Sequence, residues 1–281
     1  MTIWPVMAYD KGKRQHRKAR APARRLGQRP GAGGDSPSAA VPSPKKENMN
    51  KRQQQTKRIW EVDFLRGVAL LAMAYYHVVY DLREFYGVPI SYSDGVNFYV
   101  GRGSALLFML LAGLSCTLTG RSAKRGLKVL GLGLVITAIT FFYDPSHAVT
   151  FGILHFLGTS MLLYPLVSRL SPALLALLGI VVFFLGRLAA QTQVSVGFLF
   201  PLGLRSEGFI SSDYYPLLPW FGVFLCGAAL GKLLYAEKRS LLNASPPDTL
   251  LNKLGRHTLP IYLVHQPVIM LVLFLLWRLM G

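Results

Sequence analysis

The stretch EVDFLRGVALLAMAYYHVVYDL, residues 61–82, is long and apolar enough to cross a lipid bilayer as a helix, which takes about 20 residues. It nevertheless contains four ionisable side chains, at Asp63, Arg66, His77 and Asp81. A charged group at the centre of a membrane helix costs about 2.5–3.5 kcal/mol on insertion scales. These groups therefore need partners, water or a function.

The ionisable residues share one side of the predicted helix. At about 100° per residue, Arg66 and His77 lie only about 20° apart, and Asp63, Tyr80 and Asp81 lie within about 60° of Arg66. We call this set the polar stripe. Arg66 and His77 are about 16 Å apart in depth, and the stripe is expected to face a bundle interior or a wet cavity, because lipid cannot solvate it. The spacing of Asp63 and Arg66 also fits a simple ion pair.

The composition indicates a membrane protein built from helices. Of the 281 residues, 52% are hydrophobic and 16% are charged, and the apolar residues form long runs. We therefore expect an all-α, polytopic transmembrane bundle over residues 59–281. The apolar runs predict seven spans, at residues 59–82, 96–119, 125–143, 149–169, 172–190, 215–235 and 257–279.

Basic residues alternate between the predicted loops and give an orientation. They gather before the first span and after the second and sixth, and they are sparse in the alternate loops. By the positive-inside rule the N-terminus is predicted to be cytoplasmic and the C-terminus outside. Residues 1–58 contain 15 of the 31 Lys and Arg residues and 3 of the 13 acidic ones. This composition predicts a disordered cytoplasmic tail, and we expect no specific nucleic-acid partner for it.

This orientation places several polar side chains at similar depth. His77, Arg102 and His155 fall in the outer half of the membrane, and His265 falls near its middle. These side chains are expected to converge on an outer cavity that has Arg66 at its cytoplasmic throat, and the predicted lining residues are Asp63, Tyr80, His155 and Gln266. Two other functions fit the same residues. A transporter or flippase would use the polar stripe as its path, and a haem or metal protein would use the three histidines as ligands.

Five segments carry a resemblance to a known family. RIWEVDFLRGVALLAMAYYHVVYDL, FMLLAGLS, GILHFLG, YPLLPWFGVFLCGAALGKLL and GRHTLPIYLVHQP occur in this order. Together they resemble bacterial relatives of the heparan-α-glucosaminide N-acetyltransferase catalytic domain, over residues 58–281. The ten residues between Arg66 and His77 also resemble the first-helix signature of bacterial membrane acyltransferases that decorate sugars.

The resemblance implies acetyl transfer across a membrane. Such proteins take acetyl-CoA from the cytoplasm and pass the acetyl group to a hydroxyl or amine of a sugar on the far side. The expected partners are acetyl-CoA, a glycan or other polar acceptor and membrane lipids, with a homodimer as an open alternative, in a bacterial plasma membrane. The lysosomal enzyme has its proposed active histidine in the first lumenal loop. Here the loop at residues 83–95 has no histidine, so His77 would take that role.

The chemistry of the reaction suggests a role for each residue. An imidazole with a pKa of about 6.5 can take the acceptor proton, and a carboxylate one turn away can orient it. An arginine or an amide can stabilise the oxyanion, and basic groups at the cytoplasmic side can hold the CoA phosphates. We expect no metal ion in the site. The predicted catalytic residues are His77, Asp81, Arg102 and His265, and the predicted acetyl-CoA-binding residues are Arg66, Arg121, Lys124 and Arg125.

Overall fold

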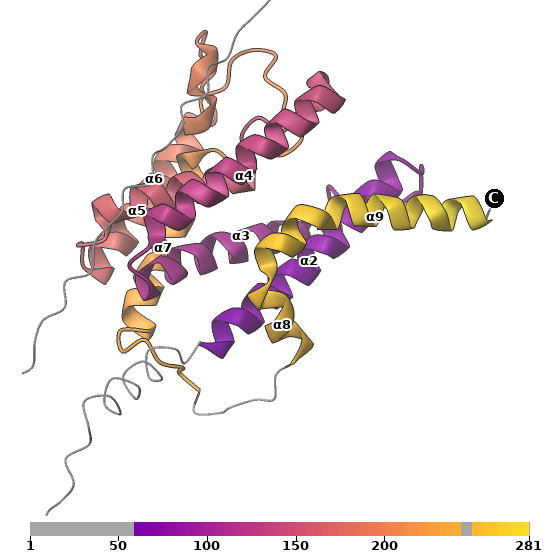
Figure 1. Cartoon of the computed structure of the whole chain (residues 1–281). Coiled ribbons are helices and arrows are strands. Elements are labelled where there is room, and N and C mark those ends of the chain that lie inside the picture. Colours follow the sequence, from indigo (N-terminus) through magenta and orange to yellow (C-terminus); the bar gives the residue numbers. More distant parts are fainter. Residues whose placement is uncertain (1–58, 243–248, 281) are drawn as a thin grey trace, which may run out of the picture. The chain divides into compact units, whose positions relative to one another are not determined.

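The computed structural model describes residues 59–242 and 249–280, so the predicted tail at residues 1–58 lies outside the part described (Figure 1). The described residues fold into helices, as the sequence predicts. The long helices are α2 (Trp60–Glu84), α3 (Gly95–Leu118), α4 (Ser122–Tyr143), α5 (Ile153–Val167), α6 (Pro172–Ala189), α7 (Leu217–Leu234) and α9 (Thr258–Met280). The shorter ones are α8 (Leu250–Arg256) and the 3-10 helices η1 (Pro145–His147) and η2 (Gly197–Leu202).

Six of these helices, all the long ones except α5, are long and apolar enough to cross a membrane. The prediction of a multi-pass helical bundle is therefore confirmed. The predicted span at residues 149–169 becomes α5, which has 15 residues. At about 1.5 Å per residue it is shorter than the roughly 30 Å of a bilayer core. It starts late because Phe151 forms a β-bridge with Tyr214. The orientation of the termini stays a prediction.

Helix α3 is the central helix of the described bundle. It packs against α2, α5 and α7, and half of its most apolar window is buried, whereas none of the corresponding window of α9 is. Small residues allow α3 and α7 to approach closely. A Cβ at Gly113 would overlap the Phe224 carbonyl oxygen, and one at Gly227 would overlap that of Leu110. Close backbone contact of this kind is a typical source of helix association in membranes.

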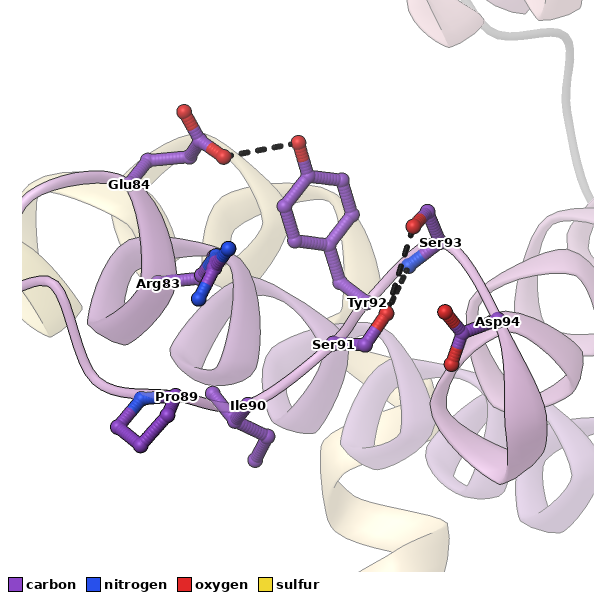
Figure 2. A pocket seen from close by; sticks show the side chains of 8 residues that line it. All are labelled: Arg83, Glu84, Pro89, Ile90, Ser91, Tyr92, Ser93 and Asp94. Carbon is purple, nitrogen blue, oxygen red and sulfur yellow. Dashed lines mark hydrogen bonds between the residues drawn. The ribbon is translucent and has the colours of Figure 1, made fainter.

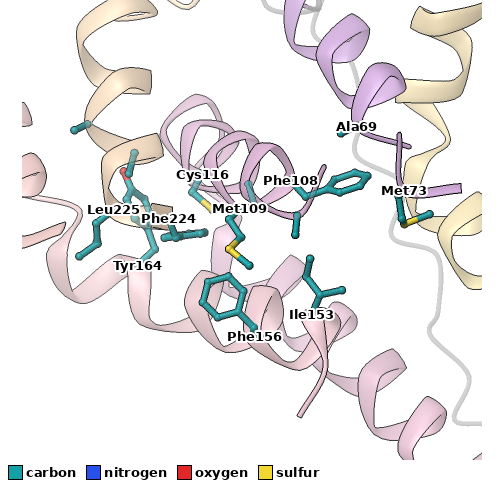
Figure 3. Close-up of a cluster of buried hydrophobic side chains, with 14 of the residues drawn as sticks. Ala69, Met73, Phe108, Met109, Cys116, Ile153, Phe156, Tyr164, Phe224 and Leu225 are labelled. Atoms are coloured by element: carbon teal, nitrogen blue, oxygen red, sulfur yellow. The ribbon is translucent and has the colours of Figure 1, made fainter. Parts of the chain in front are cut away.

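The main hydrophobic cluster lies where α2, α3, α5 and α7 meet (Figure 3). Phe156 of α5, Met109 of α3 and Phe224 of α7 are completely buried in it. Ala69 and Met73 are the residues of α2 that Figure 3 labels in this cluster. The packing fixes α2, which carries the polar stripe, against the rest of the bundle.

Helices α8 and α9 cover two different parts of α2. Gly67 of α2 lies against the Leu251 carbonyl of α8, and Gly255 of α8 lies against the Asp63 carbonyl of α2. Farther along α2, the neighbour is α9 (Figure 1). The polar stripe thus has an Arg66 end beside α8 and a His77 end beside α9.

Candidate functional site

Two histidines from different helices meet at the His77 end. The rings of His77 on α2 and His265 on α9 lie edge to face, with their centroids 4.7 Å apart and their planes at 87°. Both side chains are partly buried. The structure thus brings together two of the predicted catalytic residues.

Backbone contacts fix which ring nitrogen of each histidine carries the proton. His77 Nδ1 lies 2.9 Å from the Met73 carbonyl oxygen, and His265 Nδ1 is hydrogen bonded to the Tyr262 carbonyl oxygen. A carbonyl oxygen can only accept, so Nδ1 donates in both rings, and Nε2 of each neutral imidazole holds a lone pair. Nε2 of His265 is buried and has no hydrogen-bond partner among the described residues. The lone pair of each neutral ring is therefore at Nε2, and that of His265 is enclosed by the protein.

A buried carboxylate and an amide lie next to the histidine pair. Asp81 is 0% exposed, and Gln266 Nε2 donates to both of its oxygens, at 2.8 and 3.0 Å. The sequence suggests Asp81 as the group that orients His77, but in the structure the Met73 carbonyl does so. Asp81 pairs with Gln266 instead, because Gln266 follows His265 directly on the neighbouring helix. The Gln266 amide N–H is thus already engaged and is a poor candidate for stabilising an oxyanion.

Aromatic rings cover His77 on the side of the loop at residues 85–94. Tyr76 packs edge to face on His77 at 5.9 Å and on Tyr92 at 6.3 Å, measured between centroids. Tyr80, a predicted cavity residue, contacts Tyr92 at 4.9 Å. Sequence reasoning missed Tyr76 and Tyr92. Tyr76 directly precedes His77 in the chain, and Tyr92 lies in the loop that follows α2. An aromatic residue at each of these two positions is the feature of the sequence that could have pointed to them.

Arg102 lies between aromatic rings. Its guanidinium carbon is 5.3 Å from the Phe98 centroid and 6.0 Å from the Trp220 centroid, which are cation–π distances. The side chain is exposed, and no ion pair holds it among the residues that the structure describes. It interacts electrostatically with Tyr215. Its N–H groups are therefore available to a negatively charged group.

His155, by contrast, has both ring nitrogens occupied by the protein. The Gly152 N–H donates to Nδ1 at 3.2 Å, and Nε2 lies 3.0 Å from Thr137 Oγ1. Thr137 Oγ1 donates its own proton to the Val149 carbonyl, so it accepts from Nε2. The ring is 3% exposed. Its contacts join the start of α5 to α4 and indicate a structural role, while its place in the cavity lining stays a prediction.

Asp213 is a further candidate that the sequence reasoning missed. It lies in the loop before α7, and its Oδ2 accepts from the Ile153 N–H at 2.9 Å. Burial raises the pKa of its carboxyl, while the Ile153 hydrogen bond and the electrostatic interaction with His77 act in the opposite direction. The carboxylate is thus close enough to His77 to interact with a charge there. The one feature of the sequence that could have pointed to Asp213 is that this acidic residue directly precedes two tyrosines in a long loop.

Two guanidinium groups converge on one serine at the Arg66 end. Arg66 donates to Asp63 Oδ1 at 3.1 Å and to Ser115 Oγ, and Arg125 donates to the Ser115 carbonyl oxygen at 3.2 Å. The predicted ion pair of Asp63 with Arg66 is therefore present. Arg125 Nε is buried without a hydrogen-bond partner among the described residues. The Arg66 end thus joins two arginines from α2 and α4.

The other two predicted acetyl-CoA-binding residues, Arg121 and Lys124, are exposed at the start of α4. Between the two ends of the polar stripe, α2 presents Ala69, Leu70 and Met73, which are buried in the hydrophobic cluster. An apolar layer therefore separates the Arg66 end from the His77 end. Within the described ranges, no group of three His, Cys, Asp or Glu residues could hold a metal ion.

Comparison with known proteins identifies the family. The family described as "Heparan-alpha-glucosaminide N-acetyltransferase, catalytic" matches residues 58–267, which include both ends of the polar stripe and the histidine pair. No curated protein and no solved structure matches the chain. The match covers most of the chain and agrees with the six helices of spanning length. The chain therefore belongs to the family of the heparan-alpha-glucosaminide N-acetyltransferase catalytic domain and is a multi-pass membrane acetyltransferase.

Proposed function

We propose that this domain transfers an acetyl group from acetyl-CoA, bound from the cytoplasm, to a hydroxyl or amine of a sugar on the outer side of a bacterial plasma membrane. The observation that supports it most is the pair of histidines with unprotonated Nε2 atoms (His77 and His265) at one end of a polar stripe that has two arginines at the other. The partners are acetyl-CoA, a glycan acceptor and the surrounding lipids.

His77 acts as the general base in this reaction. Its Nε2 takes the proton of the acceptor O–H or N–H as that atom attacks the carbonyl carbon of the thioester. The new C–O or C–N bond forms, the C–S bond breaks, and the CoA thiolate recovers the proton from the imidazolium. The products are the acetylated sugar and CoA. A route through acetyl-His77 would use the same lone pair as a nucleophile.

The charge that develops in the transition state needs a donor near the histidine pair. Arg102 is the better of the two predicted candidates, because its guanidinium makes no ion pair in the described structure, whereas the Gln266 amide already donates to Asp81. Its cation–π contacts with Phe98 and Trp220 hold it on α3, the helix that packs against α2, from which it would stabilise the oxyanion. The His265 ring, packed on His77, keeps that imidazole in position.

The donor binds at the Arg66 end. CoA carries several phosphate charges, and guanidinium groups bind phosphate oxygens through paired N–H donors. Arg66 and Arg125 reach the same serine from two helices, so two guanidinium groups lie close together at this end of the bundle. The arm that carries the thioester would then pass the apolar layer, which includes the flexible side chain of Met73.

A transfer assay in sealed proteoliposomes tests this function. Acetyl-CoA labelled in the acetyl group is added on one side and a mixture of sugars is supplied on the other, for the wild-type protein and for His257→Ala, a control at an exposed histidine. We expect labelled sugar on the side opposite to the donor in both proteins. Movement of sugar without labelling would contradict the proposal and would favour a transporter.

A further inference from the structure

A pocket lies at the His77 end of the bundle, between the last turn of α2 and the loop at residues 85–94. Its volume is about 470 Å³, within the range of about 300–1,000 Å³ that is typical of small-molecule sites. Figure 2 shows the Arg83 side chain between Glu84 and the turn at Pro89 and Ile90. We call it the loop pocket, and its lining residues are Arg83, Glu84, Pro89, Ile90, Ser91, Tyr92, Ser93 and Asp94.

Hydrogen bonds from both flanking helices hold the walls of the loop pocket. Asn97 Nδ2 of α3 donates to the Ser91 carbonyl oxygen at 2.7 Å, and Tyr75 of α2 donates to Asn97 Oδ1 at 2.7 Å. The Tyr92 hydroxyl donates to Glu84 Oε1 at 2.9 Å. The pocket is therefore formed before any ligand binds, which reduces the entropy that a ligand would lose on binding.

The lining of the loop pocket suits a sugar. A sugar hydroxyl both donates and accepts, and the lining offers carboxylates as acceptors, a guanidinium as donor and hydroxyls that do either. Tyr92 adds an aromatic ring to the wall. The two carboxylates of Glu84 and Asp94 outnumber the single guanidinium of Arg83, so the pocket carries a net negative charge. That charge favours a ligand with an ammonium group and disfavours a sulfated or phosphorylated one.

Aromatic contacts connect the loop pocket to the histidine pair. Tyr92 is both a wall of the pocket and a neighbour of Tyr76, which in turn packs on His77. A ligand in the pocket thus lies two ring contacts away from the proposed base. The pocket therefore adjoins the aromatic rings that lie beside His77, and an acceptor with two rings could occupy the pocket with one ring and approach these aromatic rings with the other. Binding of a remote ring positions the reacting one and contributes to the rate.

We propose that the loop pocket is an acceptor subsite that holds an amino-sugar unit next to the ring that is acetylated. This inference rests on the proposed function for the identity of the reaction, but binding at the pocket can be measured without any transfer. The ammonium group of the amino sugar lies against the carboxylates of Glu84 and Asp94. Tyr92 packs against the face of the ring, and the reacting ring points toward His77.

Calorimetry on the full-length protein in nanodiscs tests the inference, with the glucosamine dimer as the probe. Its N-acetylated form and its 6-sulfated form serve as comparison ligands. The variants are Glu84→Gln and Asp94→Asn, each of which removes a charge. The glutamine that replaces Glu84 can still accept from the Tyr92 hydroxyl, and Asp94 makes no side-chain cap bond to α3. Glu207→Gln, at an exposed acid in another loop, is the matched control.

We expect the glucosamine dimer to bind the wild-type protein and Glu207→Gln equally, and each pocket variant to bind it about tenfold more weakly. The N-acetylated and sulfated dimers should bind the wild-type protein at least tenfold more weakly than the free amine. No binding of the glucosamine dimer, equal binding by the pocket variants, or a preference for the sulfated dimer would overturn the inference. If the dimer binds as expected but receives no label from acetyl-CoA, the proposed function fails and the subsite stands.

Discussion

His155 and the His77–His265 pair show two environments for imidazole in one membrane protein. Both nitrogens of His155 are hydrogen bonded to the protein, to the Gly152 N–H and to Thr137 Oγ1. In the pair, the hydrogen bonds that each ring makes with the described residues are at Nδ1, to a backbone carbonyl of its own helix. An imidazole with both nitrogens engaged holds structure together, whereas one with a lone pair toward a polar neighbourhood can accept a proton. Contacts, rather than residue type or depth, separate the two roles.

The largest effect is expected at the histidine pair. His77→Ala should lower kcat for acetyl transfer by about 10²–10⁴-fold, because a positioned general base contributes that much. The melting temperature in nanodiscs should change little, since His77 is only partly buried. His265→Phe keeps a ring against His77 and should lower kcat less. Steady-state transfer rates of both variants, measured alongside the control variant His257→Ala, check this prediction. If His77→Ala keeps full activity, His77 is not part of the mechanism.

The reverse pattern is expected for His155. His155→Ala leaves the Gly152 N–H without its side-chain acceptor and removes the hydrogen bond to Thr137 Oγ1, and it should cost about 1–3 kcal/mol of unfolding free energy. The kcat per folded molecule should stay within about twofold of the wild type. Thermal unfolding and transfer rates of the same preparation separate the two quantities. A stable His155→Ala protein without activity would place His155 in the site after all.

A smaller effect is expected at the Arg66 end. Arg66→Gln should raise KM for acetyl-CoA about tenfold and leave KM for the sugar unchanged, because one charge-assisted contact to a phosphate is lost. Arg66→Lys keeps the charge and should have a weaker effect. Arg278→Gln, at an exposed arginine in the last turn of α9, is the control. An unchanged KM for acetyl-CoA in Arg66→Gln would mean that Arg66 acts only through its contacts within the protein, such as those to Asp63 and Ser115.

The smallest effect is a pH dependence of stability that comes from Asp213. Burial raises the pKa of this carboxyl above its ordinary value of 3.8. The folded protein therefore holds the proton to higher pH than the unfolded chain does. The stability from this group is complete below about pH 3.8 and is lost as the pH rises through the raised pKa. Each unit of elevation is worth about 1.4 kcal/mol.

Asp213→Asn removes this contribution, and the amide oxygen of the introduced asparagine can still accept from the Ile153 N–H. Unfolding free energies between pH 4 and 7 should therefore fall more steeply for the wild type than for the variant. Glu207→Gln, at an exposed acid in the same loop, should keep the wild-type slope. Equal slopes for Asp213→Asn and the wild type would mean that the carboxyl titrates normally.

Spans could be predicted from the sequence because hydropathy is a local property, and the helices mostly begin and end within three residues of the predicted bounds. The exception, α5, is shortened by a contact between Phe151 and Tyr214, which are far apart in the chain. The apolar layer could also have been predicted. Ala69, Leu70 and Met73 follow Arg66 by three, four and seven residues, so they lie on the same face as the polar stripe.

The partners within the site could not be predicted. Asp81 and Gln266 are separated by 185 residues, and only the packing of α9 on α2 brings them together. The expected contact between Asp81 and His77 was reasonable, because the two residues are one turn apart on one helix. In the structure the hydrogen bonds go elsewhere, from His77 Nδ1 to a backbone carbonyl at the preceding turn and from the Gln266 amide of α9 to Asp81, while Asp81 still interacts electrostatically with His77. Asp213 depends on the fold of a long loop, for which no periodic pattern exists.

The central claim is that acetyl-CoA is the donor and that it binds at one end of the polar stripe while the chemistry occurs at the other. The most direct test is to titrate the protein in nanodiscs with acetyl-CoA. CoA and ATP serve as comparison ligands, and His77→Ala and an Arg66→Gln, Arg125→Gln double variant accompany the wild type. We predict saturable binding of CoA species over ATP, kept in His77→Ala and weakened at least tenfold in the double variant. No binding of acetyl-CoA to a folded wild-type protein would contradict the claim.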